Sequence, residues 1–203
     1  MTTIRPYAPG DEAAVYDVCL KTGDAGQDAT HLHTDPRALG NVYVGPYLRF
    51  EPELAFVLED EAGVGGYVLA ARDSKRFFQR YVREWLPPLQ AKHPAPVGDP
   101  NVWSETEKIY DLYHHPDVFC PGPYEVYPAH LHIDLLPRMQ GQGWGRRMIE
   151  TQLAALRQAG APGVHLGMHR SNDRAYGFYR RLGFTELVQT PDSIYLGRTL
   201  NET

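Results

Sequence analysis

Three glycines stand at alternate positions in the stretch RMQGQGWGRRM, residues 138–148. They lie between an apolar run, HLHIDLL, and a predicted helix whose apolar residues recur at helical spacing, Met148, Ile149, Leu153 and Leu156. The first turn of a helix has backbone N–H groups without partners and carries the positive end of the helix dipole. A glycine-containing junction between a strand and a helix therefore favours binding of a phosphate or another anion to the backbone.

Two common phosphate-binding patterns do not fit this junction. A P-loop requires Gly-Lys-Ser/Thr, whereas here Trp144 and Arg146 follow the glycines. A dinucleotide-binding G-x-G-x-x-G requires glycine at position 146 and an acidic residue at the end of the next strand. The next predicted strand, VHLGM, is followed instead by His169 and Arg170. Both nucleotide-binding classes are therefore excluded.

A third pattern, Gln/Arg-x-x-Gly-x-Gly/Ala, fits Gln140, Gly143 and Gly145. On these six residues alone, a glycine-rich turn without a ligand remains an equal alternative. A second motif follows in HRSNDRAYGFYRRLGF, residues 169–184. It predicts a short helix that Asn172 opens and Gly183 ends, with one side formed by Ala175, Phe178, Tyr179 and Leu182.

Together the two motifs resemble the GNAT superfamily of acetyl-CoA-dependent N-acetyltransferases over residues 129–188. The resemblance implies a mixed α/β (α+β) fold with a mostly antiparallel central sheet and helices on both faces. It also implies a central parallel pair that splays apart, strands 131–135 and 164–168, and acetyl-CoA as co-substrate. The cofactor-binding residues it implies are Ile133, Leu135, Leu136, Gln140, Gly141, Gln142, Gly143, Trp144, Gly145, Arg146, Asn172 and Tyr179.

A wider resemblance runs through IRPYAPGDEAAVYDVCLKT, YVGPYL, FVLEDEAGVGGYVLA, SETEKI, HIDL and LGRTL. These stretches are similar to the acetyltransferase-like C-terminal domain of eukaryotic O-GlcNAcase, here expected without a hydrolase domain. That domain is regarded as a pseudo-acetyltransferase with a degenerate pyrophosphate loop, whereas this chain keeps Gln140, Gly143 and Gly145. Two functions stay open: an N-acetyltransferase, or a pseudoenzyme that binds acetyl-CoA as a sensor or protein-interaction module.

The resemblance implies catalytic roles for a few side chains. Tyr179 takes the place of the family's usual acid, which protonates the departing thiolate; the alternative is a core aromatic. An alkyl amine with a pKa near ~10.4 must lose a proton before it attacks. Strand alternation places His130, His132 and Asp134 on one face. The base could be Asp134, which matches the O-GlcNAcase-like domain. The alternatives are one of the two histidines or a water relay.

Composition limits the remaining possibilities. An apolar content of 42% with 22% charged residues indicates one globular domain over residues 1–203, with a helical insertion at about 73–128. The net charge of −5 argues against nucleic acid or a membrane surface as partner and favours a cationic acceptor. No apolar signal segment is present, so we expect a cytoplasmic protein. We expect no metal, because the histidine pairs lack further ligands at zinc spacing.

The acceptor is not identified by the sequence. An amine-bearing small molecule, an amino sugar, a protein lysine and a peptide N-terminus all remain possible, and so do a monomer and a homodimer. Five aromatic residues are interpreted as packing rather than as substrate contacts: Tyr43, Tyr47, Trp85, Trp103 and Tyr110.

The elements that position these residues are also predicted. LAFVLED and GGYVLAARD form a hairpin. Asp11 caps a helix that ends before Gly23, and Ser104 with Glu107 forms a capping box for a helix through Tyr113. Residues 75–92 read as an amphipathic helix broken at its two adjacent prolines, 87 and 88.

Overall fold

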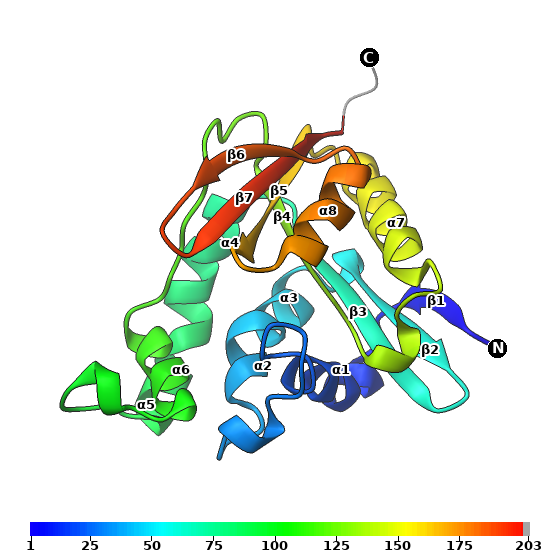
Figure 1. Ribbon diagram of the computed structural model, residues 1–203. Coiled ribbons are helices and arrows are strands. Elements are labelled where there is room, and N and C mark those ends of the chain that lie inside the picture. Colours follow the sequence, from blue (N-terminus) through cyan, green and yellow to red (C-terminus); the bar gives the residue numbers. More distant parts are fainter. Residues whose placement is uncertain (201–203) are drawn as a thin grey trace.

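One seven-stranded sheet organises the computed structural model, which describes residues 1–200 (Figure 1). The strand order is β1-β2-β3-β4-β5-β7-β6, and every neighbouring pair is antiparallel except β4 and β5. The strands are β1 (Thr3–Pro6), β2 (Ala55–Asp60), β3 (Gly63–Ala71), β4 (Ala129–Leu135), β5 (Gly163–His169), β6 (Thr185–Gln189) and β7 (Ser193–Thr199). The predicted mixed sheet with one parallel pair is confirmed.

The parallel pair is joined at one end only. Its registered partners are Ala129 with Val164 and His130 with His165, and beyond these residues the two strands are no longer paired. On its other edge β4 stays paired with β3 along nearly its whole length. The backbone groups of β4 and β5 that face each other past His130 are therefore free to pair with another molecule.

Helices cover both faces of the sheet. One face carries α1 (Glu12–Leu20), α2 (Ala38–Tyr43), α3 (Gly45–Phe50), α4 (Ser74–Arg80), α5 (Leu86–Lys92) and α6 (Glu105–His114). The other face carries α7 (Trp144–Gln158) and α8 (Asp173–Arg181). Short 3₁₀ helices span Pro9–Asp11, Thr30–Leu32, Pro52–Leu54, Pro100–Val102 and Pro137–Met139. Two apolar cores, one per face, result from this layering.

Helix α7 shows why the predicted periodicity was informative. Its buried face is formed by Met148, Ile149, Gln152, Leu153 and Leu156. Each large apolar side chain that is fully buried contributes roughly 1.5–3 kcal/mol relative to exposure. This packing fixes α7 against the sheet and thereby fixes the loop at its N-terminus.

The chain between β3 and β4 contains α4, α5, α6 and a return connection, residues 115–128. Figure 1 shows α5 and α6, in green, projecting away from the sheet on the side of α4. The predicted helix break at the prolines is wrong in position. Pro87 and Pro88 lie in the first turn of α5, where proline is tolerated, and the irregularity is a π-helical turn, Tyr81–Trp85.

Three local predictions have mixed outcomes. The hairpin of β2 and β3 and the capping box of Ser104 and Glu107 are confirmed. Asp11 precedes α1, but its side chain does not cap that helix. It instead accepts a hydrogen bond from the Ala8 N–H, 2.8 Å, and pairs with Arg5, because Asp11 ends a 3₁₀ turn that Ala8 precedes and its side chain caps that turn. Within residues 1–200 no helix combines the length and apolar character that crossing a lipid bilayer requires.

Candidate active site

Two of the three alternate glycines adopt a backbone conformation that favours glycine. Gly141 and Gly143 have φ values of +75° and +80°, in the left-handed region that other residues rarely adopt. Gly145 has an ordinary φ but lies against Phe178 of α8, whose ring would be 3.5 Å from an added Cβ. The first two glycines shape the loop, whereas an added Cβ at Gly145 would make only ordinary van der Waals contact with α8.

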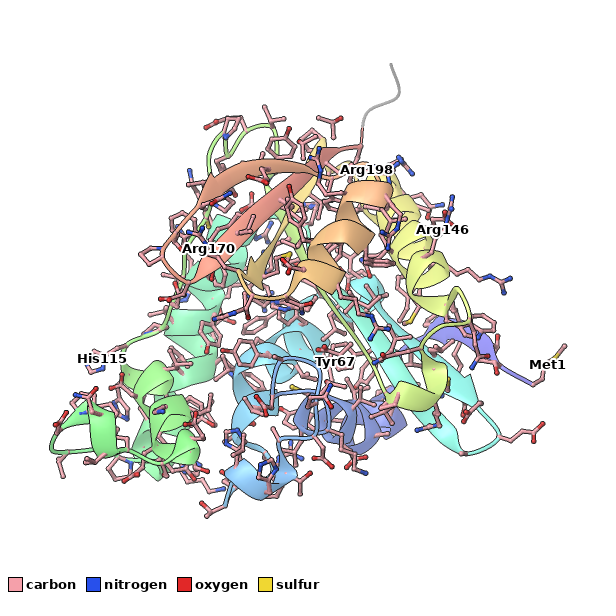
Figure 2. The ribbon with its side chains drawn as sticks, viewed as in Figure 1. Met1, Tyr67, His115, Arg146, Arg170 and Arg198 are labelled. Carbon is pink, nitrogen blue, oxygen red and sulfur yellow. The ribbon has the colours of Figure 1, made fainter. Side chains whose placement is uncertain are left out.

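The N-terminus of α7 has the properties of an anion site. Gly143 occupies the N-cap position and provides no side-chain cap. The first helical hydrogen bond runs from the Arg147 N–H to the Gly143 carbonyl, so the three preceding N–H groups have no helical partner. The first turn contains no acidic residue and instead contains Arg146, which Figure 2 shows on α7. The positive charge of Arg146 is unfavourable beside the positive end of the helix dipole. A bound anion would be attracted by both and would offset this repulsion.

A cavity of about 460 Å³ opens beside this loop, and we call it the loop cavity. The end of β4, the loop and α8 form most of its wall, and the α1–α2 connection forms the rest. Ten of the predicted residues line it: Ile133, Asp134, Leu135, Gln140, Gly141, Gly143, Gly145, Arg146, Asn172 and Tyr179. The fold thus gathers residues from three separate segments around one space.

Four predicted residues do not line the loop cavity. The Leu136 backbone N–H bonds to the Gly65 carbonyl, 2.8 Å, and its side chain is buried in the core. Gln142 turns back to donate to the Arg138 carbonyl, 3.0 Å. Trp144 packs beneath the Arg147 guanidinium, and His132 faces a different cavity.

Two polar side chains brace the loop cavity. The Gln140 amide donates to the Leu135 carbonyl, 2.8 Å, and so ties the loop to the end of β4. The Asn172 side-chain oxygen accepts from the Ala175 N–H, 3.0 Å, and caps α8. The capping bond leaves the Asn172 amide NH₂ group as the donor available to the cavity.

Several lining residues were not predicted from the sequence. Thr22, Ala25, Gly26 and Gln27 come from the α1–α2 connection, which folds over the cavity. Arg174 and Arg181 lie on α8 and add positive charge. The arginine-rich run after Asn172 was a usable signal, whereas nothing in the α1–α2 connection marks it as a cavity wall.

Asp134 combines burial with a strong hydrogen bond. The Tyr67 hydroxyl donates to Asp134 Oδ2, 2.5 Å, from the paired position on β3. Burial raises the pKa of Asp134 to about 6, although the hydrogen bond from Tyr67 acts in the opposite direction. Tyr67 itself lies in the interior, as Figure 2 shows. Asp134 is therefore a carboxylate at pH 7 with more than usual proton affinity.

Tyr179 reaches the same cavity from α8. Its ring packs against Phe178 and Phe184, with centroid distances of 5.2 and 5.7 Å. Burial, and then the charge of Asp134, raise its pKa above the ordinary value of a tyrosine. Tyr179 thus keeps its proton at physiological pH and makes no side-chain hydrogen bond within the described chain.

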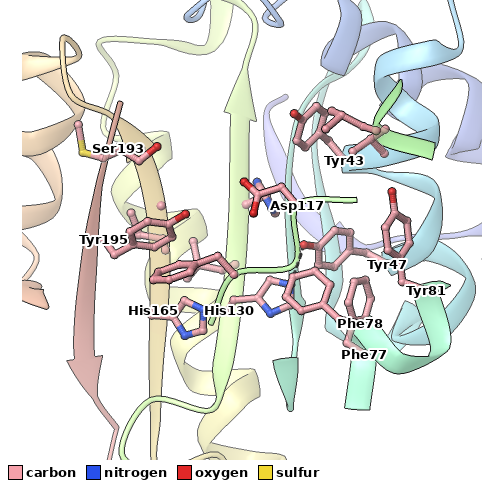
Figure 3. A pocket seen from close by; sticks show the side chains of 18 of the residues that line it. Tyr43, Tyr47, Phe77, Phe78, Tyr81, Asp117, His130, His165, Ser193 and Tyr195 are labelled. Carbon is pink, nitrogen blue, oxygen red and sulfur yellow. Dashed lines mark hydrogen bonds between the residues drawn. The ribbon is translucent and has the colours of Figure 1, made fainter. Parts of the chain in front are cut away.

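A second cavity, of about 410 Å³, lies along β4, β5 and β7 on the face covered by α1–α6. We call it the aromatic cavity (Figure 3). Its walls include His130 and His132 of β4 and His165 of β5. Five aromatic rings line one side, namely Tyr43, Tyr47, Phe77, Phe78 and Tyr81. Tyr43 and Tyr47, interpreted from the sequence as packing, thus also face a cavity.

The hydrogen bonds of His130 fix its tautomer. Ser74 Oγ donates to the Pro128 carbonyl, 2.7 Å, so it can only accept from His130 Nδ1, also 2.7 Å away. The proton of His130 therefore sits on Nδ1, and Nε2 accepts from the Tyr47 hydroxyl, 2.7 Å. Burial holds the pKa of His130 well below its usual range. His130 is a neutral residue that positions Tyr47.

The other two histidines are neutral as well. His165 is held through Nδ1 by the Tyr127 carbonyl, 2.8 Å, and burial lowers its pKa. Burial lowers the pKa of His132 to about 4, and no side-chain hydrogen bond engages it within residues 1–200. The described chain contains no group of three or more His, Cys, Asp or Glu side chains placed to hold a metal ion.

Comparison with known proteins identifies the fold family. Residues 108–186 match the family described as Acetyltransferase (GNAT) domain. The crystal structure of SsHAT is 44% identical in sequence and superposes with a TM-score of 0.89, over 99% of each chain. The chain belongs to the GNAT acetyltransferase family. The splayed β4–β5 pair and the loop before α7 are thus parts of a GNAT domain.

Other GNAT-fold structures are more distant. The structure of yncA, a putative acetyltransferase from Salmonella typhimurium with its cofactor acetyl-CoA, is 16% identical with a TM-score of 0.58, covering 100% of this chain and 95% of that one. This likeness shows the fold alone.

The GNAT domain also resembles part of a larger enzyme. Protein O-GlcNAcase of Rattus norvegicus is 31% identical over 98% of this chain, and the chain spans 22% of that protein's length. The same values hold for Protein O-GlcNAcase of Mus musculus.

Proposed function

We propose that this GNAT domain transfers the acetyl group of acetyl-CoA to a primary amine. The observation that carries the proposal is the anion site at the start of α7, which borders the loop cavity at the splayed end of β4. The GNAT fold relative yncA has acetyl-CoA as its cofactor, which supports the same ligand here.

Bound acetyl-CoA would extend along the whole loop cavity. The pyrophosphate would accept hydrogen bonds from the free N–H groups at the start of α7. Arg146, Arg174 and Arg181 would add attraction for the phosphates. The pantetheine amides would pair with the open edges of β4 and β5, and Asn172 would donate its remaining amide hydrogens.

Acetyl transfer requires two proton movements. The amine nitrogen attacks the thioester carbonyl carbon, and the carbonyl oxygen becomes an oxyanion that a free backbone N–H of β4 would stabilise. The carbon–sulfur bond then breaks, and Tyr179 would donate its proton to the leaving thiolate. Asp134 would take the proton that the amine loses, so that both side chains act from one cavity.

Asp134 suits the role of base better than His132 does. An alkyl ammonium has a pKa near ~10.4. Proton transfer from it to Asp134, with a pKa of about 6, is therefore less unfavourable than transfer to His132, with a pKa of about 4. The difference between these two pKa values corresponds to a difference of about 3 kcal/mol in the free energy of proton transfer. Asp134 also shares the loop cavity with Tyr179, at the splay where the thioester would lie.

Calorimetric titration with acetyl-CoA tests the binding site. Gly143→Asp would place a negative charge beside the phosphates and should weaken acetyl-CoA binding by at least tenfold. Gly160→Asp is the matched control, because Gly160 also has a left-handed φ, +79°, with nothing within 4 Å of an added Cβ. Gly160 lies at the opposite end of α7 and should leave binding unchanged. Equal acetyl-CoA affinity in the two folded variants would refute the site.

A thiol-release assay with acetyl-CoA and a panel of amines then tests turnover. Release that depends on the amine supports the transferase. Tight binding of acetyl-CoA with no release by any amine would instead identify a cofactor-binding pseudoenzyme.

A further inference from the structure

The aromatic cavity lies where an acceptor would have to enter. Its floor is formed by His130, Leu131 and His132 of β4, and the next residues along that strand, Ile133 and Asp134, line the loop cavity. The same strand therefore passes directly from one cavity to the other, at the place where β4 and β5 are no longer paired. An amine held in the aromatic cavity would face a thioester held in the splay.

The walls of this cavity are mostly ring faces and apolar side chains. Tyr47 is held by its hydrogen bond to His130, and Phe77 packs against Tyr47 with a centroid distance of 4.5 Å. Phe78 stacks on the His130 ring, at 5.1 Å and 7° between planes. Such flat walls favour a flat apolar group.

One carboxylate lies at the mouth of the cavity. Asp117, in the return connection, is exposed, and among residues 1–200 it is the only acidic residue that lines the cavity. Burial is the main cause that raises the pKa of Tyr43 on α2 and of Tyr195 on β7, and the charge of Asp117 adds to both shifts, since it lies near both sides of the mouth. Figure 3 shows Asp117 between these two tyrosines. Three of the four histidines in the wall, His130, His132 and His165, are neutral and contribute no opposing positive charge, so the Asp117 carboxylate makes the mouth attractive to a cation.

The return connection also closes part of the mouth. Phe119, two residues after Asp117, packs on Tyr195 of β7 with a centroid distance of 4.7 Å and is still 43% exposed. We call residues 117–119, which lie across the opening, the strap. The volume of about 410 Å³ is near the lower end for small-molecule sites, roughly 300–1,000 Å³. A strapped cavity of this size favours a small molecule over a protein segment.

We propose that the aromatic cavity is the acceptor site and takes a small primary amine carried on a flat apolar body. Asp117 attracts the ammonium group to the mouth, the rings of the wall pack against the body, and Phe119 covers it. This inference rests on the proposed acetyl transfer, and it names the class of amine that the site would acetylate.

Phenethylamine serves as the test amine, compared with spermidine, glucosamine and a lysine-containing peptide in the thiol-release assay. We expect the highest kcat/KM for phenethylamine. Asp117→Asn should raise its KM roughly two- to fivefold, the effect of one exposed ion pair, and leave the KM for acetyl-CoA unchanged. Binding of phenethyl alcohol, which lacks the charge, should not respond to Asp117→Asn.

Two control variants match the strap substitutions. Glu125→Gln makes the same charge change in the same connection at an exposed residue outside the cavity wall. Val118→Ala truncates an exposed neighbour outside the wall, whereas Phe119→Ala should raise the KM for phenethylamine several-fold. Equal effects of Asp117→Asn and Glu125→Gln would overturn the role of Asp117.

Calorimetry separates failure of this inference from failure of the proposed function. If acetyl-CoA binds and spermidine, glucosamine or the peptide is the better acceptor, acetyl transfer stands and the acceptor class is wrong. If acetyl-CoA does not bind, the proposed function is wrong. If acetyl-CoA binds without turnover, titration of phenethylamine into the CoA-loaded protein decides: binding that Asp117→Asn weakens supports the site, and no binding refutes it.

Discussion

Tyr67 and Asp134 face each other across the β3–β4 pairing, and the Tyr67 hydroxyl donates a hydrogen bond of 2.5 Å to the carboxylate. Tyr67 is fully buried, so this donor cannot be replaced readily by water. The bond favours the charged form of Asp134, while burial favours the neutral form. The balance leaves Asp134 with a pKa of about 6, low enough for it to act as a base at neutral pH.

Replacing Tyr67 by phenylalanine tests this balance. Loss of a hydrogen bond to a charged group should raise the pKa of Asp134 by about one unit. The acidic limb of the kcat/KM profile should therefore move to higher pH, which a purely structural role would not cause. Tyr113→Phe is the control, because Tyr113 is also a buried donor but lines neither cavity. If the acidic limb of the kcat/KM profile stays at the same pH in the Tyr67→Phe protein, Asp134 is not the base.

Tyr179→Phe tests the proposed acid. The ring and its packing on Phe178 and Phe184 are kept, so stability and acetyl-CoA affinity should hardly change. The rate of the chemical step should fall by about 10²- to 10⁴-fold if a positioned acid is lost. Single-turnover thiol release measures it. A loss near tenfold would mean that water replaces the tyrosine, and equal rates in the two proteins would refute its role.

The neutral histidines predict how stability depends on pH. The pKa values of His130, His132 and His165 are lowered in the folded chain, so between about pH 4 and 6.5 the unfolded chain binds more protons. Stability is therefore fully present above about pH 6.5 and falls as pH decreases. Asp134, with its raised pKa, acts in the opposite direction between about pH 4 and 6.

Three histidines outweigh this single carboxyl group, so the net slope should be positive and the free energy of unfolding should decrease as pH falls from 7 to 5.5. Urea denaturation at pH 7 and pH 5.5 measures it. His132→Asn should make the slope shallower, because one titrating group is removed. A free energy of unfolding that is constant between the two pH values would contradict the neutral state of the histidines.

Gln152 is a polar residue that weakens the core. It lies on the buried face of α7 with no exposed area, and both amide atoms have no partner within the described residues. Burying an unpaired amide costs about 1–3 kcal/mol. Gln152→Met keeps the length of the side chain and should raise the free energy of unfolding by a similar amount, measured by urea denaturation. Gln158→Met, at an exposed position of the same helix, should have almost no effect, and a destabilised Gln152→Met protein would mean that the amide is satisfied by an internal water.

Local elements could be predicted where one physical signal dominates. The apolar periodicity of α7, the hairpin of β2 and β3 and the capping box at Ser104 depend on residues close together in sequence. The helix over residues 75–92 was predicted less well. The two prolines are compatible with the first turn of a new helix, and the π-helical turn before them leaves no simple pattern in the sequence.

The candidate site could also be predicted only where local residues determine it. The spacing of Gln140, Gly143 and Gly145 predicted where the proposed anion site would lie, because left-handed backbone and free helical N–H groups are local properties. The sequence also placed His132 and Asp134 on one face of β4, since alternation is a property of a single strand.

Only the tertiary structure decided that these two side chains serve different cavities. Asp134 borders the loop cavity because α8 and the α1–α2 connection close over the end of β4. His132 borders the aromatic cavity because α2, α3, α4 and the strap surround the middle of the same strand. A pKa, a cavity wall and a tautomer depend on groups brought together from distant parts of the chain, and local sequence carries no record of those neighbours.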